Sequence, residues 1–230
     1  MAETSLPPEV STLRIPPDRP LVIVDVDEVV GMFMRGFEAF IGGHGLEMRI
    51  DRFALFQNLY RPGETTHVDV SHGRQLFDAF FECDPHPMDV APGAAAGLAA
   101  LADEATIVIL SNAPAACREA RARWLAENGL PYPLVIGAGP KGPTVAALAS
   151  RTSEATAFVD DLLPNLDSVE AEAPDVHRFQ SVADERLRPY APSAPDHHPR
   201  FDSWTDLAPA IARALKLTVH DLAGHGSAGD

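Results

Sequence analysis

The chain has 230 residues, of which 46% are hydrophobic, enough for one well-packed domain or for a domain that carries a smaller insertion. Its formal net charge of -15 argues against a nucleic acid or an anionic membrane surface as the main partner, because phosphate contacts require lysine and arginine. A small anionic substrate in a locally positive pocket stays compatible with this charge.

Two cysteines, Cys83 and Cys117, lack the number and spacing of a disulfide framework or a zinc site, so we expect reduced thiols. The N-terminus has no apolar core of a signal peptide, and no apolar run reaches the roughly 18 residues of a membrane span. These features predict a soluble cytoplasmic protein.

Residues 1–19 are polar and rich in proline, and are predicted to form a loose arm. Short apolar runs then recur along the chain, separated by helix-like stretches. The runs are continuous rather than alternating, as is typical of strands buried on both faces of a parallel sheet. This alternation predicts an α/β fold, a Rossmann-like doubly wound parallel sheet. The predicted strands are 21–24, 106–110, 133–136, 156–159 and 176–179, and helices are predicted at 114–128, 143–150 and 163–172.

About 80 residues separate the first two predicted strands, far more than one crossover helix requires. We expect 31–90 to form an inserted α-helical cap domain, in which residues 50–59 add a third helix to two amphipathic ones. The rest of the fold, 20–30 and 91–217, then forms the α/β core, which the chain re-enters through a helix that begins near Pro92. The two amphipathic helices are predicted from Phe33, Phe37, Phe40 and Ile41, and from Leu76, Phe77, Phe80 and Phe81.

Residues 181–202 are rich in proline, histidine and arginine and are predicted to form a loop. The pair His197–His198 is expected to be exposed, because no third metal ligand lies near it in the sequence. Ser203 and Asp206 form a capping box before an apolar stripe, although Pro209 fits that helix poorly unless the helix starts later. A disordered tail is predicted for 218–230.

Polar residues follow each of the first four predicted strands. Because ligands of open α/β sheets bind beyond the carboxyl ends of the strands, we expect these side chains to converge on one edge. The chain has two lysines against sixteen arginines, so a lysine in one of these loops suggests that a compact positive charge is required there. The residues are Asp25 and Asp27, then Ser111 and Asn112, then Lys141, and finally Asp160, Asp161 and Asn165.

Four stretches, LVIVDVDEV, TIVILSN, GPKGP and FVDDLLPN, resemble the motifs of the haloacid dehalogenase (HAD) superfamily and occur in that family's order. The resemblance covers about residues 20–180 and extends to the insertion, which looks like a helical cap placed directly after the first motif (a C1-type cap). One departure is Glu28, where many members have glycine. We expect this larger residue to change the turn that opens toward the cap.

The resemblance implies a Mg²⁺-dependent phosphatase of a small phosphorylated metabolite. Asp25 would be the nucleophile that forms an aspartyl-phosphate, and Asp27 the general acid and base. Ser111, Asn112 and Lys141 would hold the phosphate. The metal ligands would be Asp25, Asp27 through its backbone carbonyl, and Asp161, with Asp160 assisting. Candidate substrate contacts in the cap are Arg35, Arg61, His67 and Arg74.

Several alternatives differ in identifiable residues. A dehalogenase does not need the second acid, and a phosphonatase uses a cap lysine, whereas residues 28–92 contain no lysine. A phosphomutase on the same scaffold and a catalytically silent HAD-like binding protein stay open. A signalling receiver domain also uses acids, a hydroxyl and a lysine, but its motif order and size do not fit. The sequence fixes neither the substrate nor the oligomeric state.

Overall fold

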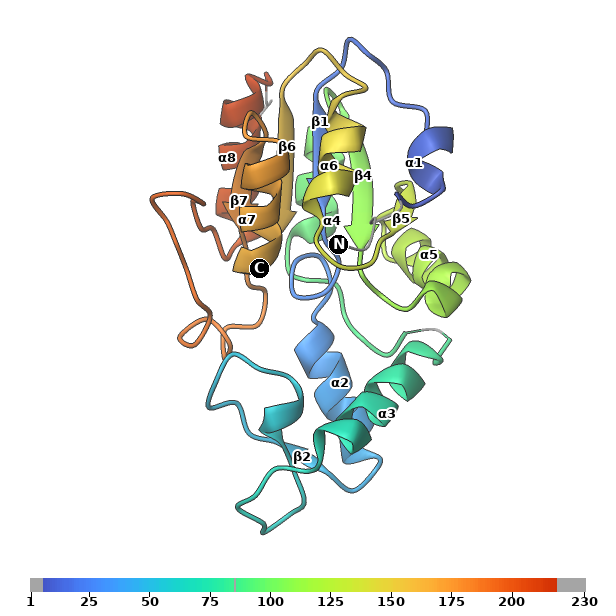
Figure 1. The fold of residues 1–230 in the computed structure, drawn as a ribbon, viewed down its shortest axis with the longest axis vertical. Coiled ribbons are helices and arrows are strands. Elements are labelled where there is room, and N and C mark those ends of the chain that lie inside the picture. Colours follow the sequence, from blue (N-terminus) through green and yellow to red (C-terminus); the bar gives the residue numbers. More distant parts are fainter. Residues whose placement is uncertain (1–5, 85, 219–230) are drawn as a thin grey trace, which may run out of the picture.

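The computed structural model describes residues 6–84 and 86–218. Its centre is a five-stranded parallel sheet in the order β5-β4-β1-β6-β7 (Figure 1). The strand order reverses at β1, the position at which open α/β sheets bind ligands. The predicted α/β class and all five predicted strands are confirmed, with small shifts at their ends. The strands are β1 (Leu21–Val24), β4 (Thr106–Ser111), β5 (Leu134–Ile136), β6 (Thr156–Asp160) and β7 (His177–Gln180).

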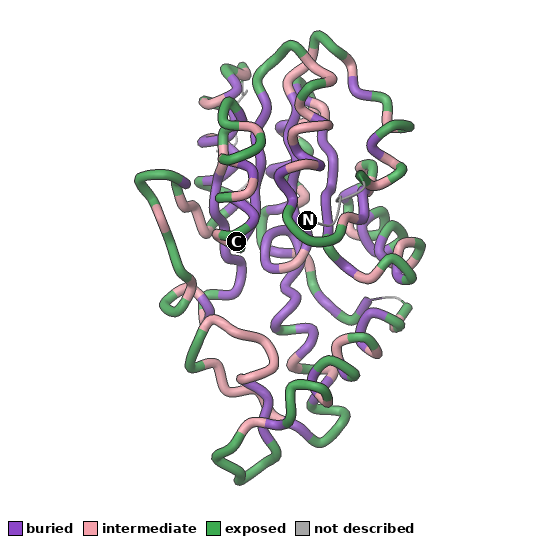
Figure 2. Tube along the Cα trace, viewed as in Figure 1, coloured by how far each residue is buried: buried purple, intermediate pink, exposed green. Residues whose placement is uncertain are grey.

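Helices cover both faces of the sheet, which explains the continuous apolar strands. In β1, Val22 and Val24 pack on one face, while Leu21 and Ile23 pack on the other. All four side chains are fully buried, and buried residues run along the strands in Figure 2. The first face carries α4 (Ala94–Ala102), η2 (Ala115–Cys117), α5 (Arg118–Glu127) and α8 (Trp204–Leu215), and the second carries α1 (Glu9–Thr12), α6 (Gly142–Ala149) and α7 (Leu163–Glu172).

Residues 33–81 lie beyond the carboxyl edge of the sheet, at the bottom of Figure 1. The two predicted amphipathic helices are present and pack through their phenyl rings, with Phe80 edge-on to Phe33 at 5.3 Å and to Phe37 at 5.6 Å between ring centroids. The elements of this segment are α2 (Phe33–Gly42), β2 (Glu47–Met48), η1 (Phe56–Asn58), β3 (Leu59–Tyr60) and α3 (Val70–Phe81).

The expected third helix over 50–59 is wrong. Only the single turn η1 forms there, because β2 and β3 pair as an antiparallel ribbon on either side of it. Asn58 is fully buried and donates its side-chain N–H groups to the carbonyls of Arg52 and Ala54, which holds the connecting loop. Pairing between distant residues therefore overrides the local pattern.

The N-terminal arm is packed rather than loose in its described part, because Val10 and Ile15 are buried against the second face of the sheet. The helix α8 starts directly after Ser203, whose hydroxyl accepts from the Thr205 N–H at 3.2 Å, and it contains Pro209. Proline there removes one backbone hydrogen bond of the helix. Apart from Thr218, the predicted disordered tail lies outside the described residues.

The loop 181–202 folds back on the sheet, which changes the expected environment of its histidine pair. His197 is exposed, but His198 is fully buried, with its ring 3.0 Å from Asp167 and 3.4 Å from the Arg178 side chain. The expected exposure is therefore wrong for His198. Among the described residues, no helix is both long and apolar enough to cross a bilayer.

Candidate active site

Parallel pairing of β1 with β6 brings three carboxylates together at the carboxyl edge of the sheet. Val24 lies beside Val159, so the next residues, Asp25 and Asp160, are neighbours, and the Asp25 N–H donates to the Val159 carbonyl at 3.0 Å. One carboxylate oxygen from each of Asp25, Asp160 and Asp161 lies within 4.8 Å of the others. The predicted convergence of strands distant in sequence is therefore present at this edge.

Lys141 reaches the same point from the start of α6. Its Nζ lies 2.6 Å from an Asp25 oxygen and 2.7 Å from an Asp160 oxygen, and its side chain is almost fully buried. Burial alone would lower the pKa of Lys141, but the contacts with Asp160 and Asp25 raise it above its usual value. The ammonium group thus stays charged and offsets part of the negative charge.

Burial, together with the remaining negative charge, raises the pKa of two of the acids. Burial raises the pKa of Asp25 to about 7, with Asp160 and Asp27 adding to the rise and Lys141 opposing it. Burial, together with Asp160 and Asp25, also raises the pKa of Asp161 well above its ordinary value. A hard divalent cation among these oxygens would stabilise the charged form of both acids and so lower both pKa values. A donor set made only of oxygen atoms suits Mg²⁺. The residues present therefore fit that ion.

Asp160 is fixed by hydrogen bonds that leave it little freedom to move. Its Oδ1 accepts from the Leu162 N–H and from the Asn165 side chain, both at 2.9 Å, while its Oδ2 contacts Lys141. The side chain is fully buried. Asp160 therefore orients Lys141, and Asn165 in turn orients Asp160.

Ser111 is the last residue of β4, on the other side of β1 from β6, and Asn112 follows it directly. Asn112 lines the cavity in front of the acids, and its amide donates to the Gly139 carbonyl at 2.8 Å, which ties this loop to the one after β5. Ser111 is fully buried behind it, where its hydroxyl accepts from the Ala113 N–H at 3.2 Å. Of the three predicted phosphate contacts, Asn112 and Lys141 line the cavity, whereas Ser111 does not.

Asp27 lines the cavity too, but its side chain has a partner that sequence reasoning missed. Arg121 on α5 is fully buried, donates to both Asp27 oxygens at 2.9 and 3.2 Å, and lies 5.0 Å from the centre of the Phe81 ring. The sequence offers no signal for this role, because Arg121 stands among Arg118 and Arg123 on a helix without a clear apolar stripe.

Glu28, the departure from the family pattern, adopts a left-handed backbone with φ of 61°. Its carboxylate accepts from the Met34 N–H at 2.7 Å and the Asp184 N–H at 2.9 Å, which joins the first turn of α2 to the loop after β7. Burial raises the pKa of Glu28 to about 7 in spite of these two bonds. The side chain that replaces glycine thus fastens the inserted segment to the core.

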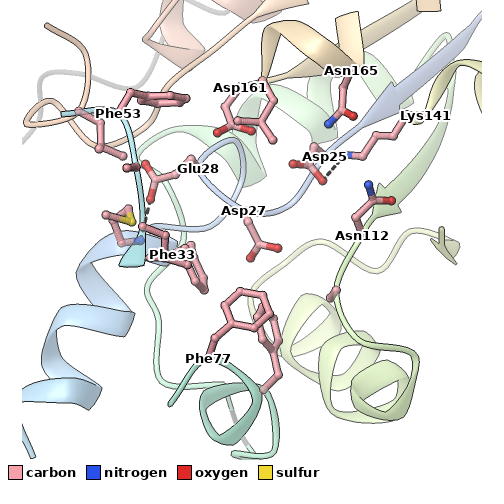
Figure 3. Close-up of a pocket in the computed structure, with 17 residues that line it drawn as sticks. Asp25, Asp27, Glu28, Phe33, Phe53, Phe77, Asn112, Lys141, Asp161 and Asn165 are labelled. Atoms are coloured by element: carbon pink, nitrogen blue, oxygen red, sulfur yellow. Dashed lines mark hydrogen bonds and ion pairs between the residues drawn. The ribbon is translucent and has the colours of Figure 1, made fainter. Parts of the chain in front are cut away.

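A cavity of about 360 Å³ lies between the acids and the segment 33–81 (Figure 3). None of the four candidate contacts of that segment lines it. Arg35 pairs with Asp184 and Glu185, and Arg61 is exposed. The His67 ring donates to the Val68 carbonyl, and the Arg74 guanidinium lies 5.6 Å from the centre of the Phe56 ring.

Comparison with solved structures identifies the fold. An L-2-haloacid dehalogenase aligns over 84% of this chain and 100% of its own, with 16% identity and a TM-score of 0.56. A HAD-superfamily hydrolase from Ehrlichia chaffeensis aligns over 86% and 98%, with 15% identity and a TM-score of 0.52. The HAD-hydrolase YfnB from Bacillus subtilis, bound to magnesium, aligns over 84% and 99%, with 13% identity and a TM-score of 0.52.

No protein-family profile and no curated protein sequence matches the chain. The chain therefore has the HAD fold, as the motif resemblance predicted, although its sequence is only 13–16% identical to those of these structures.

Proposed function

We propose that the chain is a HAD-type hydrolase that cleaves a small phosphomonoester through a phosphorylated Asp25. The observation that carries this proposal is the convergence of four side chains at a partly open cavity, where Asp25, Asp161 and Lys141 line the floor and Asp160 lies buried directly behind them. Residues 31–90 act as the cap over that floor, and the core comprises 20–30 and 91–217. Catalysis then depends on side chains of the core, and substrate choice depends mainly on the cap.

In the first step an Asp25 oxygen attacks phosphorus, and the bond from phosphorus to the ester oxygen breaks. Asp27 enters this step protonated, on a lone pair that Arg121 does not occupy, and gives that proton to the leaving oxygen. In the second step water attacks phosphorus, Asp27 takes a proton from that water, and the bond from phosphorus to Asp25 breaks. Inorganic phosphate and the free Asp25 carboxylate result. Lys141 opposes the negative charge on Asp25 and on the phosphoryl oxygens throughout.

Mg²⁺, held by Asp25, Asp161 and the Asp27 backbone carbonyl with Asp160 behind them, would screen the charge between the carboxylate and the phosphoryl group. Burial and neighbouring carboxylates raise the pKa of Asp25 to about 7 and also raise the pKa of Asp161. These raised values support a requirement for a cation, because a cation bound among buried carboxylates that repel one another would stabilise their charged form. The magnesium-bound HAD-hydrolase with the same fold is consistent with it.

A dehalogenase is the second candidate, because the cavity has apolar walls and one neighbour in fold is an L-2-haloacid dehalogenase. Asp25 would then displace halide from carbon, and neither Asp27 nor a metal ion would be required. Asp27 at the rim of the cavity is the feature that favours phosphoryl transfer instead.

The test is a panel of sugar phosphates, nucleotides, p-nitrophenyl phosphate and 2-chloropropionate, with Mg²⁺ and with a chelator. We expect phosphate release that requires Mg²⁺ and disappears in Asp25→Asn, while the exposed loop variant Asp196→Asn keeps full activity. Halide release without Mg²⁺ would favour the dehalogenase. Phosphate release that persists in Asp25→Asn would remove Asp25 as the nucleophile.

A further inference from the structure

The walls of the cavity above Asp25 are almost entirely apolar. Most of the wall residues come from both helices of the segment 33–81 and from the loop between them, and phenyl rings face the acids in Figure 3. The wall residues from this segment are Phe33, Met34, Phe53, Ala54, Leu55, Phe77 and Phe81.

The polar side chains that line the cavity lie at its floor and rim. The two that lie nearest the apolar walls, Glu28 and Asp27, already form hydrogen bonds within the protein. Both Glu28 oxygens accept from backbone N–H groups, and both Asp27 oxygens accept from Arg121. Among the described residues that line the cavity, Lys141 is the only one with a cationic side chain. The side chains of the described walls therefore offer no hydrogen-bond donor to a second anionic group of a substrate.

Three of the five arginines of the inserted segment form ion pairs outside the cavity, and the other two, Arg61 and Arg74, do not line it either. Arg35 pairs with Glu185, Arg49 with Glu47, and Arg52 with Asp51. Each of these arginines thus meets a carboxylate of the protein itself, outside the cavity lining. A second phosphate or a carboxylate on the substrate would lose its hydration without gaining an ion pair.

We infer that the substrate is the phosphomonoester of a small apolar or aromatic alcohol, whose single charged group is the phosphoryl group. This inference rests on the proposed function. A cavity of about 360 Å³ is near the lower end of ligand pockets, so one ring or a short branched chain fits beyond the phosphoryl group. Phe33 and Phe77 already meet edge to face at 6.0 Å, and an aromatic substrate ring extends the same packing.

The first test compares benzyl phosphate with glycerol 3-phosphate and 2-phosphoglycolate in the presence of Mg²⁺, because all three esters have alcohol leaving groups. The expected kcat/KM is at least about tenfold higher for benzyl phosphate, because hydroxyl and carboxylate groups find no side-chain partner at the walls. Equal or higher kcat/KM for either polar ester overturns the inference and leaves the proposed hydrolysis standing.

The second test places a cation on the wall. Phe53→Arg is expected to raise the kcat/KM ratio of 2-phosphoglycolate to benzyl phosphate at least about tenfold, because the arginine offers the carboxylate a partner. Val70→Arg is the matched control, since Val70 is exposed on α3 and does not line the cavity, and its ratio should stay that of the wild type. Circular dichroism establishes that both variants fold. An unchanged ratio in folded Phe53→Arg contradicts the inference.

A third test separates recognition from chemistry by measuring calorimetric binding of phenylphosphonate and phosphonoacetate, which are not phosphate esters. Tighter binding of phenylphosphonate supports the inference even if no ester is hydrolysed, and in that case the proposed function alone fails. Equal binding of the two compounds, tighter binding of phosphonoacetate, or binding of neither overturns the inference.

Discussion

Arg121 binds both carboxylate oxygens of Asp27, at 2.9 and 3.2 Å, from a position in which the guanidinium is fully buried. Asp27 is about a quarter exposed at the edge of the cavity, so the pair joins the protein interior to the candidate active site. Each carboxylate oxygen keeps a second lone pair, which leaves Asp27 able to accept a proton from water. The arginine therefore fixes where Asp27 points and leaves it free for the proton transfers proposed above.

Removal of one partner of this pair should cost more than removal of both. Asp27→Ala leaves the Arg121 charge buried without a counterion, and we expect it to lower the free energy of unfolding by about 3–5 kcal/mol. In Asp27→Ala with Arg121→Met, much of this loss should be recovered, because no unpaired charge stays buried. Urea denaturation of both single variants and the double variant measures the coupling. Additive losses would show that the two side chains do not depend on each other.

Glu28 offers a test of backbone strain at the junction between core and inserted segment. Glu28→Ala leaves the Met34 and Asp184 N–H groups unpaired, each at a cost of about 1–3 kcal/mol. Glu28→Gly loses the same bonds but accepts the φ of 61° without strain, so it should be more stable than the alanine variant by about 1 kcal/mol. Thermal unfolding compares the stabilities of the two variants. A lower stability of Glu28→Gly than of Glu28→Ala would argue against backbone strain at this turn.

Sequence patterns predicted those strands, helices and site residues that are encoded by neighbouring residues or by a regular spacing of residues. Continuous apolar runs gave the strands, and the polar residues after those runs gave the acids and Lys141, because the ends of parallel strands must meet at one edge. Helices α2 and α3 followed from the spacing of their phenylalanines.

Features that depend on distant pairing were not accessible in this way. The loop over 50–59 is shaped by the pairing of Glu47 with Tyr60, and no local pattern encodes that contact. The burial of Arg121 and of His198 depends on partners about 94 and 31 residues away in the chain. From sequence alone, a charged residue among other charged residues is expected to be exposed to solvent, and its burial becomes evident only when its partner in the fold is known.

Replacement of Lys141 by arginine should impair activity even though it keeps the positive charge. The ammonium group is almost fully buried between Asp25 and Asp160, 2.6 and 2.7 Å away, and a planar guanidinium is larger than the space between these two carboxylates. We expect Lys141→Arg to lower kcat for phosphate release at least about a hundredfold and to displace the acids. Steady-state kinetics checks this, with Lys216→Arg, at the end of α8, as the matched control. Near wild-type kcat in Lys141→Arg would mean that only the charge matters.

Metal-free stability should depend on pH through Asp25. In the folded chain burial raises the pKa of Asp25 from about 3.8 to about 7, so between these values the folded state holds a proton that the unfolded chain has released. The folded state therefore binds more protons in this window, and stability must fall as the pH rises from about 4 to about 7. The raised pKa of Asp161 acts in the same direction.

Mg²⁺ should reverse much of that loss, because it binds the deprotonated carboxylates and favours the folded state by mass action. We expect the rise in Tm on adding Mg²⁺ to be small at pH 5.5 and larger at pH 8, since at the lower pH protons compete with the ion. Asp161→Asn removes one acid from the cluster, so its Tm without metal should fall less with pH and its response to Mg²⁺ should shrink. Differential scanning calorimetry at both pH values, with Ca²⁺ as a second cation, makes the measurement. A Tm response to Mg²⁺ that is the same at both pH values, or that is unchanged in Asp161→Asn, would place the ion away from these carboxylates.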